Sequence, residues 1–390
     1  MRADRTVTVT GHGFEQARTE SRNEELFMQG RVVALTGPGK LEIQTYELAP
    51  PPEGGANLRV RRAQVCGSDV HMYHFRNPNF RNVVLGHEFV GEIVTLGPRL
   101  EVDSAGSPVT IGDRVVVVYF QTCGRCIACG RGEPNLCVNS IELMRRPPTA
   151  TPHFHGAFAS HYRLSPGQSF YKVPDEVSDA EVAGANCGLA QMLFSLDGVG
   201  LNRARTVVVQ GAGGLGLYAT AIAHHSGARV VVVEKEPVRI AAARAFGASE
   251  VIDMSTYATA EQRRVRLLEL THGHGADLVV EVTGHPEAFQ EAVGFARTGG
   301  SIAAVGNLNA GDGFEVKISP AVFTRKNLRV HGYLRYDPWY LKKAVDFISD
   351  TREQYPFESL SDRVYGLEDV HAAIAGSESR QVARPAIIPS

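Results

Sequence analysis

Four of the six cysteines of this chain lie close together in the sequence. Two, two and seven residues separate them, in a stretch that also contains several glycines: Cys123, Cys126, Cys129 and Cys137. Thiolates at this spacing on a loop can surround one zinc ion tetrahedrally, and four protein ligands leave no position open for a substrate. The spacing therefore predicts a structural zinc site.

Three further residues with metal-ligating side chains are dispersed along the chain: Cys66, His87 and Cys187. Two sulfurs and one imidazole would supply three ligands to a second zinc ion and leave a fourth position for water or a substrate oxygen, as a catalytic zinc requires. Taken singly, such a cysteine is commonly a small core residue and such a histidine a hydrogen-bonded polar residue. Their combination with the four-cysteine loop favours a second metal site.

A glycine-rich segment follows an apolar run and precedes a helical stretch. It reads Gly211-Ala212-Gly213-Gly214-Leu215-Gly216, directly after Gln210. This spacing permits a tight turn, lets the backbone approach a pyrophosphate and brings a helix N-terminus to the phosphates. The segment predicts a dinucleotide-binding loop, although a glycine-rich turn without a ligand would have the same pattern.

Three charged residues bear on which dinucleotide the loop would bind. Glu234 ends the next apolar run, where a carboxylate can accept hydrogen bonds from the adenosine ribose hydroxyls, and this favours NAD over NADP. Lys235 and Arg239 follow closely, and either could weaken that preference.

The region from about 204 to 333 alternates between short apolar runs and helical stretches. The runs are expected to be strands at 207–209, 230–233, 251–252, 278–282, 302–305 and 328–330. Helices are expected between them at 215–225, 237–246, 260–271 and 286–297. Six strands with intervening helices predict a parallel, doubly wound α/β sheet.

The preceding region has short β-rich runs that glycine and proline punctuate. They lie at 32–35, 58–65, 89–96 and 115–119 and predict a compact antiparallel or barrel-like domain. An amphipathic segment at 339–348, a strand-like run at 361–365 and a helix near 367–375 are expected to return to this domain. Residues 1–30 are polar and unpatterned, which predicts an N-terminal tail.

The composition excludes several function classes. The 390 residues suffice for two or three domains, and a formal net charge of −2 argues against nucleic acid or acidic lipid as a partner. No apolar run approaches the roughly 18 residues of a membrane span, and the first residues lack the apolar segment of a signal peptide. We therefore expect a soluble, cytoplasmic protein.

In their order along the chain, these motifs resemble those of the zinc-containing medium-chain alcohol dehydrogenases. The motifs are Cys66-Gly67-Ser68-Asp69, Gly86-His87-Glu88, the four-cysteine loop and Gly211 to Gly216, and the resemblance extends from about Arg31 to the C-terminus. It implies a GroES-like catalytic domain at 31–187 and 334–390, a Rossmann NAD-binding domain at 188–333, a cleft between them, and homodimers or homotetramers.

The resemblance also implies roles for individual residues. Cys66, His87 and Cys187 would bind the catalytic zinc, Asp69 would orient His87, and Glu88 would lie behind the metal. Ser68 and His71 would form a proton relay. The implied reaction is reversible hydride transfer between a primary or secondary alcohol and NAD, with zinc as the Lewis acid.

Three alternative functions would not require all of these motifs. A zinc-free quinone or enoyl reductase of the same superfamily would need the glycine-rich loop but neither set of cysteines. A non-catalytic protein that senses NAD would need neither Ser68 nor an open metal position. A zinc-ribbon protein that binds nucleic acid conflicts with the charge balance.

The residues that select the substrate are harder to identify. Arg76 and Arg81 could receive an anionic group, or could simply form a solvated loop face. Five residues are candidates for the pocket wall, each with core packing as the alternative: Tyr119, Phe120, Phe154, Asn186 and Trp339. The segment 144–155 lies where relatives vary, so the sequence predicts a small-molecule alcohol or carbonyl compound without naming it.

Overall fold

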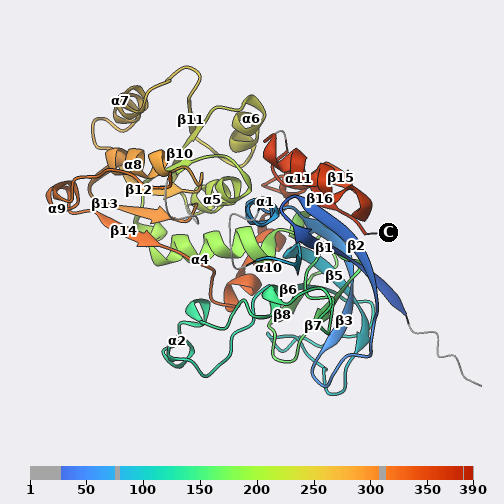
Figure 1. Ribbon diagram of the computed structural model, residues 1–390. Coiled ribbons are helices and arrows are strands. Elements are labelled where there is room, and N and C mark those ends of the chain that lie inside the picture. The colour runs from blue at the N-terminus through green and yellow to red at the C-terminus, as the bar shows by residue number, and fades with distance from the viewer. Residues whose placement is uncertain (1–27, 75–79, 307–312, 381, 390) are drawn as a thin grey trace, which may run out of the picture.

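The computed structural model describes residues 28–74, 80–306, 313–380 and 382–389. Almost all of the expected tail at 1–30, and Arg76, lie outside these ranges. The described residues form three sheets, of which the parallel one lies at the upper left of Figure 1 and the antiparallel strands lie at the lower right. No helix within these ranges is long and apolar enough to cross a membrane.

Two sheets make up the mainly antiparallel part, in which β15 pairs with β16 in parallel. The smaller has the order β2-β1-β4, and the larger has the order β15-β16-β3-β5-β6-β8 with β7 also paired to β3. The strands are β1 (Gln29–Gly37), β2 (Lys40–Glu47), β3 (Ala56–Gln64), β4 (Val83–Val84), β5 (Glu88–Leu96), β6 (Arg114–Val117), β7 (His161–Leu164), β8 (Phe170–Lys172), β15 (Val364–Tyr365) and β16 (Ala386–Ile387). Strand β16 pairs with β3, so the C-terminal segment completes the larger sheet.

The parallel sheet confirms the expected doubly wound architecture. Its order is β11-β10-β9-β12-β13-β14, and every pairing is parallel. The strands are β9 (Thr206–Gln210), β10 (Arg229–Glu234), β11 (Glu250–Asp253), β12 (Ala276–Glu281), β13 (Ala296–Ala304) and β14 (Arg329–Gly332). The strand order reverses between β9 and β12, which is where such sheets bind their ligands.

Alternate residues of the parallel strands point to opposite faces, and both faces are covered. Val207 and Val209 pack into one core and Val208 into another. The helices are α1 (Gly67–Tyr73), α2 (Ile127–Gly130), α3 (Asp179–Val182), α4 (Ala190–Gly198), α5 (Gly214–His225), α6 (Pro237–Ala245), α7 (Ala260–Leu270), α8 (Pro286–Phe295), α9 (Ala321–Lys326), α10 (Trp339–Thr351) and α11 (Val370–Glu378). Burial on both faces explains the continuous valine runs.

Helices α4 and α10 join the two parts of the molecule. They contact each other, and residues of both share one core with Val116 of the antiparallel part and Val209 of the parallel sheet (Figure 1). Because this core is continuous, the assignment of strands to sheets does not define where one domain ends and the next begins. The domain boundaries at 187/188 and 333/334 stay predictions.

Several elements differ from the sequence-based expectation: strands β4, β7, β8 and β16 were not expected, and the strand expected at 361–365 is confined to Val364–Tyr365. Two further differences have a clear physical reason. The helix expected at 286–297 ends at Phe295, because Ala296 already pairs with Ala276 of the neighbouring strand. Strand β2 was not expected, since its residues are exposed or only half-buried and show no apolar run. Its long register with β1 supplies the stabilising contacts instead.

The turn between β9 and α5 is close-packed on its inner side. A Cβ atom on Gly216 would lie 1.8 Å from the Gly211 carbonyl oxygen, and Gly211 has φ +92°, a left-handed conformation that favours glycine. A Cβ on Gly213 would meet only Arg239 Nη1, at 3.9 Å. The outer side of the turn is therefore open.

We predict that Gly216→Ala destabilises the protein by about 1–3 kcal/mol, because the added methyl group must separate the strand from the helix. Denaturant unfolding of the purified variants measures this. Gly213→Ala is the matched control in the same turn and should unfold close to the wild type. Equal losses in the two variants would show that the inner side of the turn is not sterically limited.

Candidate metal centres and cofactor loop

Three segments that are distant in sequence bring the dispersed ligand set together. Cys66 immediately precedes α1, His87 immediately precedes β5, and Cys187 lies in a π-helical turn between α3 and α4. Ligand atoms of these three residues and of Glu88 all lie within 4.8 Å of one another. The geometry therefore brings the predicted ligands of the catalytic zinc into one cluster.

The π-helical turn Ala185–Leu189 directs the Cys187 side chain. Such turns insert an extra residue into a helix, re-aim the side chains that follow, and are common at functional sites. Gly188 is required there, because a Cβ atom would lie 2.5 Å from Arg384 Nη2. Asn186 holds the same turn against β5 and β6, since its Nδ2 donates to the carbonyls of His87 and Val117 at 3.0 Å each.

A buried aspartate orients the histidine of this cluster. Asp69 Oδ1 lies 3.3 Å from His87 Nδ1, and Asp69 Oδ2 accepts a hydrogen bond from the Cys66 backbone N–H at 2.9 Å. The other ring nitrogen of His87, Nε2, lies 3.3 Å from Ser68 Oγ. Nε2 is thus directed towards the partly exposed cysteines, and Ser68 lies on that side of the imidazole.

The charges within the cluster favour a bound cation. The hydrogen bond from Cys187 lowers the pKa of Cys66 well below the usual thiol range, and the same contact raises the pKa of Cys187. A divalent metal that binds both sulfurs would displace the proton of this hydrogen bond. Two soft sulfurs and one oriented imidazole suit zinc, so the residues present fit this ion.

A buried arginine that the sequence analysis missed connects this cluster to the glycine-rich loop. Arg384 Nη1 is ion-paired with Glu88 Oε2, and a Cβ atom on Gly214 would overlap Arg384 Nε. Burial raises the pKa of Glu88, and the Arg384 charge opposes this. The two partners lie 296 residues apart, and no local motif marks Arg384.

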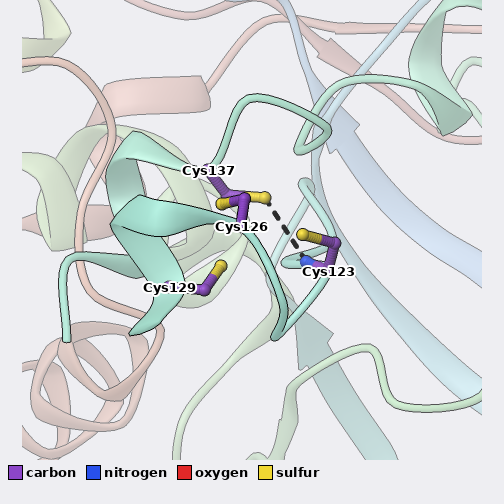
Figure 2. Close-up of side chains that lie close together, drawn as sticks. All are labelled: Cys123, Cys126, Cys129 and Cys137. Carbon is purple, nitrogen blue, oxygen red and sulfur yellow. Dashed lines mark hydrogen bonds between the residues drawn. The ribbon is translucent and has the colours of Figure 1, made fainter. Parts of the chain in front are cut away.

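The four-cysteine loop also closes around a common centre. Figure 2 shows the sulfurs of Cys123, Cys126, Cys129 and Cys137 facing one another, and their Sγ atoms all lie within 4.8 Å of one another. The Cys123 backbone N–H donates to Cys137 Sγ at 3.3 Å. The arrangement fits a tetrahedral zinc with no open position.

Backbone amides around this loop favour thiolates. The Arg125 N–H lowers the pKa of Cys123 to about 6, and the Cys129 N–H lowers the pKa of Cys126. Desolvation and the neighbouring sulfur of Cys126 raise the pKa of Cys129 to about 11. A bound cation would remove this repulsion between sulfurs.

Glu234 lies at the glycine-rich loop, and its carboxylate already accepts hydrogen bonds from backbone N–H groups. Its Oε2 accepts from the Ala212 N–H at 2.9 Å, and its Oε1 accepts from the Lys235 N–H at 2.7 Å. Each carboxylate oxygen can accept further bonds, so hydrogen bonds to a ribose stay possible. The Lys235 side chain is directed to Glu236, whereas the Arg239 guanidinium lies near Gly213. Leu215 packs against the core.

The five candidate wall residues have different surroundings. The Tyr119 ring lies 5.1 Å from the His87 ring, and Phe120 packs at its edge. Phe154 is fully buried in a small apolar core, and Asn186 is fully buried as the hydrogen-bonding residue described above. Trp339 is half exposed and packs edge-on against Tyr171. Tyr119 is therefore the candidate whose ring lies against a ligand side chain, whereas Asn186 contacts the backbone of His87.

Comparison with known proteins gives consistent matches over most of the chain. Residues 52–175 match the family described as alcohol dehydrogenase GroES-like domain, and residues 214–350 match the zinc-binding dehydrogenase family. The 5-exo-hydroxycamphor dehydrogenase of Pseudomonas putida is 30% identical over 363 residues, which cover 92% of this chain and 98% of that protein. A probable alcohol dehydrogenase of Mycobacterium tuberculosis is 33% identical over 366 residues, which cover 89% of this chain and 94% of that protein.

A solved structure extends the likeness to the whole fold. The crystal structure of an alcohol dehydrogenase from Thermotoga maritima matches with a TM-score of 0.85 and 30% identity, and the match covers 93% of this chain and 100% of that one. The chain therefore belongs to the zinc-type medium-chain dehydrogenase/reductase family, the family of the alcohol dehydrogenases, and is an oxidoreductase.

Proposed function

We propose that the protein catalyses reversible hydride transfer between a primary or secondary alcohol and NAD, with one catalytic and one structural zinc ion in each subunit. The observation that carries this proposal is the convergence of Cys66, His87 and Cys187 beside Ser68. Arg384 reaches from Glu88 to Gly214, so the ligand cluster and the glycine-rich loop serve one site. Homodimers or homotetramers are part of the proposal.

The residues around the ligand cluster prepare it for a metal. A zinc ion, when bound, supplies a Lewis acid that polarises the substrate oxygen. Asp69 holds His87 with Nε2 on the side of the two cysteines, and Glu88, kept in place by Arg384, lies beside the ligands. A zinc-free reductase would have no use for this convergence, which argues against that alternative.

The proton of the alcohol leaves along α1. Ser68 is the first acceptor, because its Oγ lies beside the metal-facing nitrogen of His87. His71 is three residues further along the same helix, hence on the same face, and is partly exposed. Ser68 therefore hands the proton outward towards His71 and solvent.

Metal analysis tests the division between the two zinc sites. We predict about two zinc ions per subunit in the wild type. Cys126→Ser should lose one zinc and much of the folding stability, since structural zinc contributes on the order of 10 kcal/mol of binding energy coupled to folding. Cys66→Ala should also lose one zinc but keep its unfolding midpoint and lose turnover. Identical behaviour of the two variants would contradict the assignment.

The preference for NAD follows from the Glu234 charge. We predict that kcat/KM with NAD exceeds that with NADP by about tenfold or more, because a 2'-phosphate would lie near this carboxylate in a partly desolvated turn. Arg239→Gln should sharpen the preference for NAD. A wild type that prefers NADP would instead mean that Arg239 dominates the electrostatics.

The proposed proton route predicts a larger loss of activity at Ser68 than at His71. Ser68→Ala should lower kcat/KM by roughly 10²- to 10⁴-fold with zinc content unchanged, the range typical of positioned proton transfer. His71→Ala should cost only about 10-fold, and added imidazole should restore part of it, because an external base can replace the outer acceptor. Near-normal turnover in Ser68→Ala with both zinc ions present would exclude this route.

A further inference from the structure

A cavity of about 550 Å³ lies at the amino ends of the parallel strands, beside the last turn of α4. Figure 1 shows α4 next to β14, and the residues that line the cavity come from four stretches: 197–204, 277–278, 297–301 and 329–331. The glycine-rich turn follows β9 and therefore lies at the opposite, carboxyl edge of the same sheet. The cavity is thus separate from the proposed cofactor loop.

One row of side chains on the parallel sheet becomes polar where it reaches this cavity. The row crosses four adjacent strands at paired positions: Val207, Leu278, Ser301 and Arg329. Side chains at paired positions point to the same face of a sheet, and Val207 and Leu278 lie in the core that α4 shares. Ser301 and Arg329 therefore continue this row outward from the core, and both line the cavity.

Ser301 supplies a buried polar group that faces the cavity. Only 7% of this residue is exposed, yet its hydroxyl makes no hydrogen bond to any residue that the structure describes. A buried hydroxyl without a partner costs free energy, so native structures normally provide one. His331, on the same face of β14 as Arg329, also lines the cavity. A polar ligand in the cavity would therefore satisfy the Ser301 hydroxyl.

The two carboxylates that line the cavity already have cationic partners. Asp277 Oδ1 is paired with Arg297 Nε at 2.6 Å, and its Oδ2 accepts from two backbone N–H groups at 3.0 and 2.9 Å. Asp197 Oδ2 is paired with Lys343 Nζ at 3.2 Å and accepts from a tyrosine hydroxyl at 2.7 Å. The charges of both aspartates are therefore matched without the other arginines of the lining.

Those other two arginines, Arg203 and Arg329, give the cavity an excess of positive charge. Both are exposed, and neither makes an ion pair or a hydrogen bond within the part of the chain that the structure describes. The C-terminal end of α4 would disfavour an anion nearby. Two of its last carbonyls, however, accept hydrogen bonds from the N–H groups of Val199 and Gly200, at 3.1 and 3.0 Å. The guanidinium groups therefore dominate the charge of the cavity.

We propose that this cavity binds a small sugar phosphate, at a site separate from the catalytic one. The forked donors of Arg203 and Arg329 match the oxygens of a phosphate dianion. The Asn202 amide and the Ser301 hydroxyl also line the cavity and suit the hydroxyls of a sugar. A volume of about 550 Å³ is typical of small-molecule sites and exceeds what inorganic phosphate alone would fill.

Calorimetric titration of the holoenzyme tests the proposal, with the reduced nicotinamide cofactor at saturation so that phosphates cannot occupy the cofactor loop. Ribose 5-phosphate and glucose 6-phosphate are the probes, and inorganic phosphate is the comparison. We expect at least one of the two sugar phosphates to bind about tenfold more tightly than inorganic phosphate, because the sugar adds contacts in the cavity. If neither binds, or if neither binds more tightly than inorganic phosphate, the proposal is wrong.

Substitutions locate the binding. Arg203→Gln and Arg329→Gln should each weaken it by about tenfold, because each removes one charged donor, and should leave the unfolding midpoint unchanged. Arg325→Gln is the matched control, since Arg325 is exposed on α9 and does not line the cavity, and it should bind as the wild type does. Binding that survives in the double variant Arg203→Gln/Arg329→Gln would belong to another site and overturn the proposal. An equal loss in Arg325→Gln would show a general effect of charge and overturn it too.

Discussion

One buried carboxylate, that of Asp69, fixes the relative position of two metal ligands from separate segments. It accepts a hydrogen bond from the backbone of Cys66 at the start of α1, and its other oxygen faces the imidazole of His87. Gly86 N–H, just before His87, also lies 3.3 Å from that oxygen. Because the side chain is fully buried, losing any of these contacts would leave an unsatisfied charge inside the protein. Helix α1 and strand β5 are therefore held in one arrangement, which Ser68 and Glu88 share.

A second constraint ties this arrangement to the parallel sheet. Arg384 enters from the C-terminal segment that completes the antiparallel sheet, and it passes between Glu88 and two glycines, Gly188 and Gly214. A side chain at either glycine would collide with the guanidinium. The glycine-rich turn therefore has two steric tasks, since it leaves its outer side open and also accommodates an arginine from the other part of the molecule.

The sequence predicted those features that depend on local spacing. The six parallel strands follow from valine runs buried on both faces, and the four-cysteine loop follows from four residues within one turn-rich stretch. It did not reveal Arg384, whose partner is 296 residues away. Strand β2 was missed for a related reason, because its stability comes from its partner β1 and its own residues show no buried face.

The length of the π-helical turn at Cys187 sets both the direction of the Cys187 side chain and the rotation of α4 about its own axis. Each residue of an α-helix advances the side chains by about 100°, so removing the extra residue of the turn would rotate everything that follows. Met192 and Leu196 of α4, which are fully buried, would then leave the shared core. A deletion here could not restore an ordinary helix at the cost of the metal site alone. Inserting or deleting one residue in this turn would therefore disturb the core as well as the metal site. Substitutions that keep the length of the turn can still adjust the site.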